Sequence, residues 1–412
     1  MEKWIKSIKG TIPHTNKTVD IELNGKNLIV TGGNGSGKTS FLREVYRKVE
    51  LLIVQKRAAD IQGLRINHND LQYHLSRQTK GTTDYDTVKH SVEILENKIK
   101  EFEEGLQIEI PQNIMFSSLY DERKAIIRFF EEKRLAEIVK PTGVKGLQTE
   151  KEDAQKNDNQ KLGNALEQHL VNLKTRASLA ITEDKNEKLA NEINNWLNTF
   201  ERNLKKLFED DSVKLSFAFE VDKTGFTILQ NGKPPFTFQT LSAGYRAIFD
   251  VYAELLMRTE YFDVMPNELT GVVFIDEVDS HLHVSLQRII LPFFIESFPK
   301  IQFIVTTHSP FVLMSSSDIT VYDLEKKEIT EDLSYYTYSA VMKGLWNVKP
   351  ISAHLENTIK EIAKIVNSEQ KDYKQLEELV EATKPYENAL DSESKVFLML
   401  GVEALEEGGK NV

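Results

Sequence analysis

The strongest chemical pattern in the sequence is a glycine-rich loop that ends in lysine and threonine. Its residues match G-x-x-x-x-G-K-[ST] and are Gly32, Gly33, Asn34, Gly35, Ser36, Gly37, Lys38 and Thr39. An apolar stretch at 27–31 precedes the loop, and a helical pattern follows it. Glycines let backbone N–H groups turn towards phosphate oxygens at a helix N-terminus, so residues 32–39 and the following Ser40 are expected to bind a nucleotide. Lys38 would contact the β- and γ-phosphates, and the Thr39 hydroxyl would bind Mg²⁺.

A second pattern pairs an apolar run with two acids. Residues 272–275 are apolar, which predicts a buried parallel strand, and Asp276 and Glu277 follow at its carboxyl end. Asp276 would hold Mg²⁺ through water, and Glu277 would activate the attacking water as a general base. Such an ending is common in structural strands, and it indicates hydrolysis here because it accompanies a phosphate loop.

Two further segments contain small or titratable residues next to regular elements. Leu241-Ser242-Ala243-Gly244-Tyr245 precedes an amphipathic helical pattern. Thr306-Thr307-His308-Ser309-Pro310 follows an apolar strand at 303–305. A small residue at a helix N-terminus lets backbone N–H groups approach an anion, whereas an isolated histidine is more often structural.

These motifs must be positioned by an α/β domain with helical insertions. Val88, Val92, Leu95, Ile99 and Phe102 alternate at spacings of four and three, which predicts a short coiled-coil seam in an arm that folds back near Gly81. Apolar stripes at 162–173 and 189–204 predict a second helical pair, whose simplest interpretation is ordinary helix packing.

Several local patterns predict strands and loops. Asn24-Gly25 predicts a hairpin between strands at 19–23 and 27–31, and Thr224-Gly225 predicts another between 213–221 and 226–229. Residues 108–110 and 114–118 resemble strands, residues 125–130 fit a strand or a helix start, and the polar stretch 141–161 resembles a mobile loop. Residues 351–406 predict two or three amphipathic helices.

The sequence therefore divides into six regions, and the fold class is an α/β P-loop domain with a mixed sheet, helical insertions and a small helical tail. The expected regions are the N-terminal half of the domain (1–50), a helical arm (51–107), a return to the core (108–140), a loop with the second helical pair (141–210), the C-terminal half of the domain (211–350) and the helical tail (351–412).

Composition excludes several function classes. The net charge of −11 argues against a broad DNA-binding face, although a local basic patch or a partner could still contact nucleic acid. The longest apolar stretches are too short to span a bilayer. The absence of cysteine excludes disulfides and thiolate zinc sites and fits a cytoplasmic protein.

Taken in order, the phosphate loop, 241–245, the acidic strand and His308 resemble the motifs of ABC ATPases, in which 241–245 corresponds to an L-S-G-G-Q signature with Ala243 and Tyr245 as departures. The helical insertions and an acidic strand that continues to Leu282-His283 resemble the RecF/SMC/OLD-like branch. Within it, the chain is most similar to the PtuA-type ATPases of Septu and retron anti-phage systems.

The resemblance implies an ATP- and Mg²⁺-dependent homodimer or higher oligomer with ATP between its heads. Ser242 and Gly244 would contact the γ-phosphate bound by the other subunit, and His308 would contact the γ-phosphate and help to position water. It also implies a regulator of a separate nuclease subunit of the HNH type, because residues after Pro310 contain no nuclease-like D-x-D pair.

Two alternatives remain at this stage, a RecF/SMC-like DNA-repair or chromosome ATPase and a transporter or translation-type subunit. The short arms and acidic charge disfavour the first, and the Leu282-His283 ending disfavours the second. No glutamine is assigned to a Q-loop, and Trp4 is the one candidate for stacking on adenine. His281 and His283 diverge on a helix, which disfavours zinc.

Overall fold

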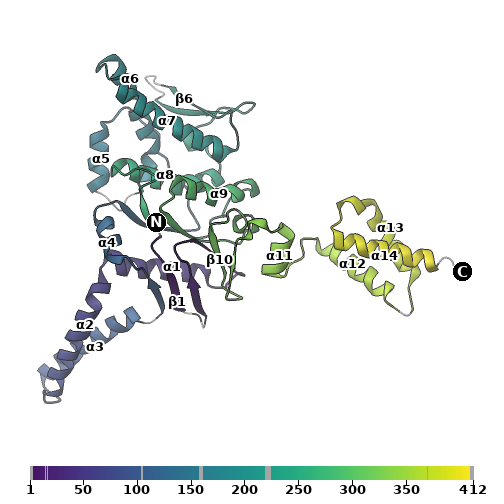
Figure 1. Cartoon of the computed structure of the whole chain (residues 1–412), viewed down its shortest axis with the longest axis horizontal. Coiled ribbons are helices and arrows are strands. Elements are labelled where there is room, and N and C mark those ends of the chain that lie inside the picture. The colour runs from purple at the N-terminus through teal and green to yellow at the C-terminus, as the bar shows by residue number, and fades with distance from the viewer. Residues whose placement is uncertain are drawn as a thin grey trace. The chain divides into compact units, whose positions relative to one another are not determined.

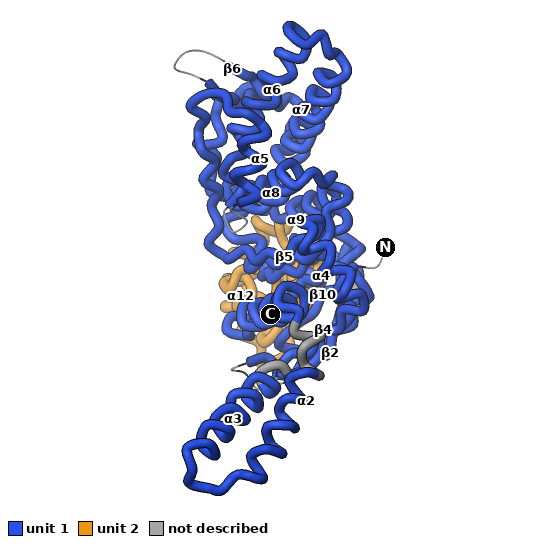
Figure 2. The backbone as a smooth tube through the Cα atoms, turned by 90° about the vertical axis from the view of Figure 1, so that its left-hand side faces the viewer, with its two compact units in different colours: residues 1–341 blue, residues 342–412 orange. Residues whose placement is uncertain are grey.

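The computed structural model describes residues 3–13, 15, 17–103, 105–156, 161–218, 224–368 and 370–408. The chain divides into two compact units, an N-terminal unit of residues 1–341 and a C-terminal unit of residues 342–412 (Figure 2). All the strands belong to the N-terminal unit (Figure 1). No helix in the described part of the chain is long and apolar enough to cross a membrane.

A six-stranded sheet lies at the centre of the N-terminal unit, with the strand order β11-β10-β3-β9-β8-β5. The five strands from β10 to β5 are parallel, and β11 pairs antiparallel with β10 at the edge. The strands are β3 (Asn27–Thr31), β5 (Ala125–Phe130), β8 (Thr270–Ile275), β9 (Ile301–Thr306), β10 (Ile319–Asp323) and β11 (Glu328–Glu331). Because β9 lies between β3 and β8, the loops that leave these three strands meet at one edge of the sheet.

Burial explains why these apolar runs become strands of the central sheet. Every residue of β3 and β9 is buried, as expected for parallel strands covered on both faces. Residues 125–130, which fit either a strand or a helix start, form β5 and pair with β8 along its whole length. Gly271 permits this pairing, since a Cβ there would lie 2.0 Å from the carbonyl oxygen of Ile126.

A smaller antiparallel sheet has the order β2-β1-β4 and comprises β1 (Ser7–Thr11), β2 (Thr18–Glu22) and β4 (Leu106–Glu109). The predicted hairpin at Asn24-Gly25 is wrong, although the turn exists and both residues have positive φ. β2 alternates between exposed and buried positions and pairs with β1, whereas the fully buried β3 belongs to the central sheet. The turn therefore connects two sheets.

The predicted helical arm is confirmed. α1 (Lys38–Val49) continues through a π-helical turn at Glu50–Val54 into α2 (Arg57–Ser76), and α3 (Thr83–Glu103) returns beside α2 (Figures 1 and 2). Gly81, with φ 89°, lies in the connection between α2 and α3. On the predicted seam Val92 is buried and Val88, Leu95 and Ile99 are half-buried, while the side chain of Phe102 lies outside the described residues.

Residues 114–118 form part of α4 (Asn113–Asp121), so the strand predicted there is wrong. Phe116 is fully buried and stacks on Trp4 with ring centroids 4.3 Å apart, whereas Ile114 is 83% exposed. Ser117 Oγ donates to the carbonyl of Ile53. Phe116 and Ser117 make these contacts from the buried face of α4. The prediction failed because a run of five residues is too short for its periodicity to distinguish a helix from a strand.

The stretch at 141–161 contains α5 (Leu147–Lys156), and the prediction of a loop throughout it is wrong. Ala154 and Glu150 are buried on α5, which contacts α6 and α8. Leu147 and Ala154 are the two apolar residues of α5, and two positions are too few to define a hydrophobic period. Residues 157–160 lie outside the described residues.

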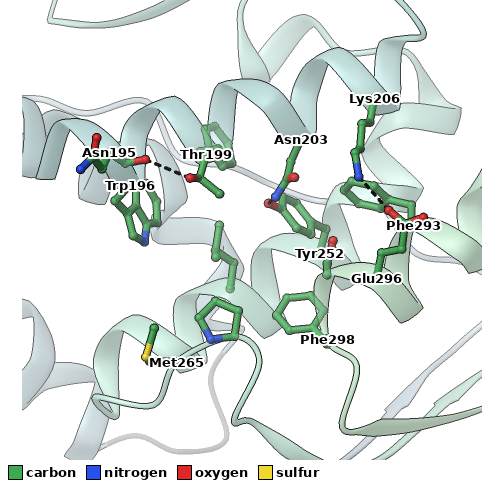
Figure 3. A pocket seen from close by; sticks show the side chains of 14 residues that line it. Asn195, Trp196, Thr199, Asn203, Lys206, Tyr252, Met265, Phe293, Glu296 and Phe298 are labelled. Carbon is green, nitrogen blue, oxygen red and sulfur yellow. Dashed lines mark hydrogen bonds and ion pairs between the residues drawn. The ribbon is translucent and has the colours of Figure 1, made fainter. Parts of the chain in front are cut away.

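The second helical pair and the second hairpin are confirmed as α6 (Leu166–Thr182), α7 (Glu187–Phe208), β6 (Lys214–Ala218) and β7 (Gly225–Leu229). Residues 219–221 of the predicted first strand lie outside the described residues. The pair lies against α8 (Ala243–Tyr261) and α9 (Val284–Ser297) (Figure 1). α7, α8 and α9 enclose a cavity of about 450 Å³, into which Trp196 and Tyr252 project (Figure 3).

The remaining elements are helical. α10 (Pro310–Leu313) follows β9, and α11 (Tyr338–Trp346) spans the boundary between the two units. In the C-terminal unit, α12 (Ala353–Val366), α13 (Tyr373–Thr383) and α14 (Ser392–Gly408) confirm the amphipathic helices predicted at 351–406. They share a core of their own, formed by Ile359, Ile362, Ile365, Leu376, Val380, Leu398 and Ala404.

Candidate nucleotide site

The phosphate loop connects the buried strand β3 to α1. Gly32, Gly35 and Gly37 have φ angles of 137°, 75° and 100°, which a residue with a Cβ rarely adopts. Gly37 is the N-cap of α1, and its first turn has no side-chain cap. The Ser36 hydroxyl is buried with no partner among the described residues. An uncapped helix N-terminus and an unsatisfied buried hydroxyl together fit a bound phosphate.

Lys38 is buried at the centre of this loop, with 5% of its side chain exposed. Its Nζ donates to the carbonyl oxygens of Gly32 at 3.2 Å and Gly33 at 3.4 Å. It also lies 2.5 Å from Nε2 of His308. Burial lowers the pKa of Lys38, and the nearby Glu277 opposes that shift. The loop carbonyls and His308 thus hold the Lys38 ammonium inside the loop.

Glu277 completes a compact group with these two residues, here called the Lys38–Glu277–His308 cluster. Its Oε1 lies 3.4 Å from His308 Nε2 and 3.9 Å from Lys38 Nζ. Burial raises the pKa of Glu277 to about 7, and the neighbouring Asp279 adds to the shift. Burial and the charge of Lys38 lower the pKa of His308, which favours the neutral ring as the acceptor of the lysine proton. The sheet order explains this convergence, since the residues follow β3, β8 and β9.

Thr306, at the end of β9, organises the acidic pair and was not singled out from the sequence. Its hydroxyl donates to Asp276 Oδ1 at 2.6 Å and accepts from the backbone N–H of Glu277 at 2.7 Å. The next residue, Thr307, donates through its hydroxyl to Asp279, and Ser309 Oγ donates to Gln287 at 2.6 Å. The histidine segment is therefore bonded on both sides to the segment that follows β8.

Arg134 is a second residue that sequence reasoning missed. It follows β5, and its guanidinium donates to the carbonyl oxygens of Asp276 at 2.7 Å, Glu277 at 2.9 Å and Val278 at 2.8 Å. Burial lowers its pKa to about 10, which leaves it charged at neutral pH. The sequence gave no pattern for Arg134, because its importance depends on β5 being the neighbour of β8.

Thr39 and Asp276 are the candidate Mg²⁺ ligands. Asp276 is 3% exposed at the carboxyl end of β8, and Thr39 is the second residue of α1. Mg²⁺ commonly keeps several waters and binds substrate phosphates with one or two protein oxygens. The two oxygen donors beside the phosphate loop fit that donor set. Asn34 and Ser40, the other loop positions expected to bind nucleotide, are exposed.

The signature segment, residues 241–245, does not join the Lys38–Glu277–His308 cluster. Ser242 is the exposed N-cap of α8, and its side chain makes no capping bond. Gly244 is buried, and a Cβ there would lie 2.9 Å from the carbonyl oxygen of His281. Within the described residues, no hydrogen bond joins Ser242 or Gly244 to the phosphate loop. A single chain therefore assembles the loop, the acids and the histidine but not the signature.

Two further sequence candidates have other roles. Trp4 is 6% exposed, stacks on Phe116 and donates through Nε1 to Thr270 at the start of β8, so the suggestion that it stacks on adenine is wrong. His283 is the N-cap of α9 and accepts from the backbone N–H of Ser285 through Nδ1.

Comparison with protein families identifies the domain. The family described as "AAA domain, putative AbiEii toxin, Type IV TA system" matches residues 85–315, which is more than half of the chain. The chain belongs to this family. The matched region includes the signature, the acidic strand and His308 but begins after the phosphate loop. The chain thus contains an ATPase domain, as its sequence predicts.

Three curated relatives share shorter segments with this ATPase. The Retron Ec83 probable ATPase of Escherichia coli is 45% identical over 75 residues, covering 18% of this chain and 14% of the relative. The Retron Vc95 probable ATPase of Vibrio cholerae serotype O1 biovar El Tor is 34% identical over 128 residues, covering 30% and 23%. The Septu protein PtuA of Bacillus mycoides (strain KBAB4) is 35% identical over 115 residues, covering 27% and 15%. The similarity to retron and Septu ATPases that the sequence predicts is confirmed, and the matches span less than a quarter of each of these relatives.

Solved structures include a similar chain in the crystal structure of an SMC head bound to the C-terminal winged-helix domain of ScpA. The two chains are 11% identical with a TM-score of 0.37, and the match covers 81% of this chain and 100% of the other.

Proposed function

We propose that this chain binds and hydrolyses ATP with Mg²⁺ at a site completed by a second copy of itself. The Lys38–Glu277–His308 cluster is the observation that carries this proposal. In it a buried lysine, a glutamate and an imidazole lie within 4 Å of one another beside a phosphate loop. That combination serves phosphoryl transfer, which depends on positioning and charge stabilisation.

Each residue of the cluster has a distinct task. Lys38 and the loop N–H groups hold the phosphates, and bound Mg²⁺ would neutralise their charge beside Thr39 and Asp276. Glu277 accepts a proton from the attacking water, for which a pKa near 7 is well matched to neutral pH. His308, which lies beside both Lys38 and Glu277, orients the water or the γ-phosphate. The Thr306 hydroxyl holds the Asp276 carboxylate and the backbone of Glu277 in place through two hydrogen bonds.

The second copy supplies Ser242 and the start of α8. An exposed serine with no capping bond at the N-terminus of a 19-residue helix is suited to an anion. Burial of Gly244 against His281 gives that glycine a role within its own chain and lets the helix start lie close to the loop after β8. The γ-phosphate on one copy would therefore be contacted by Ser242 of the other.

We further propose that this ATPase regulates a separate nuclease subunit of an anti-phage defence system. Its similarity to Septu and retron ATPases supports this role. A surface suited to a partner lies on α14, where Val396, Met399 and Leu400 are 54%, 59% and 40% exposed at i, i+3 and i+4. The opposite face of α14 packs against α12 and α13 through Leu398 and Gly401. We infer that the exposed face binds the nuclease.

One deletion and one triple substitution test whether this surface binds the nuclease. Removing residues 351–412 should leave ATP binding intact and abolish co-purification of the nuclease from the native cell. Changing Val396, Met399 and Leu400 together to serine should have the same effect without removing the helices. The matched control changes Ile66, Tyr73 and Ile94, which are exposed on the α2–α3 arm, to serine. Loss of the partner only in the control variant would place the interaction on the arm instead.

A further inference from the structure

The turn after β8 carries Glu277 in an unusual backbone conformation. Glu277 has a φ of 45°, in the left-handed region that residues with a Cβ rarely adopt. A side chain held in such a conformation needs support from its surroundings. The direction in which the Glu277 carboxylate points therefore depends on what fixes this turn.

The N–H groups of the turn are fixed by the neighbouring strands. The N–H of Asp276 donates to the carbonyl of Phe130 at the end of β5, and the N–H of Val278 donates to the carbonyl of Thr306. The N–H of Glu277 donates to the Thr306 hydroxyl. Sheet neighbours thus bind every donor from 276 to 278.

Arg134 donates to the carbonyl groups of all three residues, and the backbone N–H of Ser280 is a second donor to the Glu277 carbonyl. Its planar guanidinium, 3% exposed, donates to three consecutive carbonyl oxygens at 2.7 to 2.9 Å. Arginine presents five N–H donors in a rigid plane, whereas a lysine ammonium is a compact charge that could not span all three acceptors. Among the described residues no ion pair is formed by Arg134, although Asp250, Asp279 and Asp276 lie near enough to favour its charge. Burying a charge without a direct ion pair is costly, so its place here calls for a reason beyond stability.

We propose that Arg134 is a positioning residue for Glu277, which holds the turn after β8 so that the carboxylate faces the attacking water. This inference rests on the proposed function, because it takes Glu277 as the general base. The hydrogen bonds of Arg134 go to backbone carbonyl oxygens, so we propose that it acts through the turn rather than on the reacting atoms. Its loss should allow the turn to relax from the left-handed conformation and should slow hydrolysis without weakening ATP binding.

A small cavity beside Arg134 makes a chemical test possible. It has a volume of about 280 Å³ and is lined by Arg134, Arg128, Lys161, Asp250 and Phe249, among other residues. A guanidinium ion can enter through it after truncation of Arg134. Arg128 offers a matched control, because it lines the same cavity but donates to Glu254 on α8 rather than to the turn.

The experiment measures steady-state ATP hydrolysis by the full chain. Arg134→Ala should lower kcat on the order of 100-fold, with KM and ATP binding within about twofold of wild type. Low-millimolar guanidinium should restore part of the lost kcat, and methylammonium should not. Arg134→Lys should remain slow, and Arg128→Ala should keep near wild-type kcat and show no rescue. In a Glu277→Gln background, Arg134→Ala should cause little further loss, since both changes act through one carboxylate.

Four results separate the positioning role of Arg134 from the proposed function. A folded Arg134→Ala protein that hydrolyses ATP at the wild-type rate would overturn the positioning role, as would a full additional loss in the Glu277→Gln background. If Arg134→Ala does not fold, the test uses Arg134→Lys, which retains the buried charge. A wild-type kcat in Arg134→Lys would also overturn the proposal. Normal hydrolysis by Glu277→Gln would instead refute the proposed function, whatever Arg134 does.

Discussion

The phosphate-loop region and the signature region differ in how completely one chain builds them. Around the phosphate loop, Lys38 donates a hydrogen bond to Gly32 and Thr306 donates one to Asp276. Glu277 and His308 lie beside them. At the signature, Ser242 is exposed and its hydroxyl makes no cap. One half of the proposed site is thus prearranged, while the other half presents unused donors.

This difference teaches where activity should be controlled. The residues of the cluster follow neighbouring strands of one sheet, so a single chain already brings them together. Under the proposed function, the step open to control is the arrival of the signature from a second copy. Four predictions test the two regions separately.

The largest expected effect concerns the proposed base. Glu277→Gln should lower kcat on the order of 1000-fold, since the groups that bind phosphate remain while proton acceptance is lost. Because ATP is still bound, light scattering should detect a stable dimer in ATP and Mg²⁺. Glu131→Gln, which changes an exposed acid paired with Arg43 after β5, is the control and should hydrolyse normally. A mutant that stays monomeric in saturating ATP would contradict the two-copy site.

Lys38→Ala should weaken ATP binding on the order of 100-fold, because a buried cation facing the phosphates disappears. Titration calorimetry measures this directly. Lys17→Ala is the matched control, because Lys17 Nζ donates to the Ser36 carbonyl on the same loop. We expect the control to have a smaller effect. Equal affinity in wild type and Lys38→Ala would refute the assignment of the loop.

The pH dependence of kcat/KM tests the protonation state of the cluster. The base must be deprotonated, and burial raises the pKa of Glu277 to about 7. Between pH 6 and pH 8, kcat/KM should therefore rise about tenfold. Burial and the charge of Lys38 shift the pKa of His308 downwards, which favours the neutral ring. A profile that is flat from pH 6 to pH 8 would argue against Glu277 as the titrating group.

The smallest expected effect concerns whether Ser242 of one copy acts on the nucleotide bound by the other copy. Ser242→Arg blocks the approach of the second copy, and this exposed position avoids the in-chain clash that a side chain at Gly244 would cause. Mixed with Lys38→Ala, it forms heterodimers in which one site carries both changes and the other carries neither. An equal mixture of these inactive proteins should recover about a quarter of the wild-type rate if the two sites act independently. If neither hydrolysis nor ATP-induced dimerisation returns, Ser242 does not act across two chains.

The sequence predicted those parts of the fold that depend on local pattern. The buried strand at 27–31, the folded-back arm and the tail helices followed from apolar spacing and glycine. The helix at 113–121 did not, because Phe116 is buried through a contact with Trp4, more than one hundred residues away in sequence. The turn predicted at Asn24-Gly25 exists, but the two strands that it connects do not pair with each other. Which strand each of them pairs with depends on burial in two different sheets.

The site shows the same division. Motif spacing predicted that Lys38, Asp276, Glu277 and His308 carry the chemistry, and the structure places three of them in one cluster. Thr306 and Arg134 were missed, because a hydroxyl at a strand end and a single arginine have no distinctive pattern. Their roles follow from which strands are neighbours, and a single sequence does not specify that order.

The cavity between α7, α8 and α9 gives this ATPase an intrinsic optical reporter. Only three tryptophans occur in the chain, and Trp4 is buried while Trp196 is half-buried in the cavity wall, with its indole N–H donating to Glu260 (Figure 3). Tyr252, on the helix that Ser242 begins, lies in the same wall and receives a hydrogen bond from Asn203 on α7. A shift of α8 against α7 would change the polarity around the Trp196 indole. Fluorescence from a variant that retains Trp196 alone would therefore record movement of the signature helix in real time, without any attached dye.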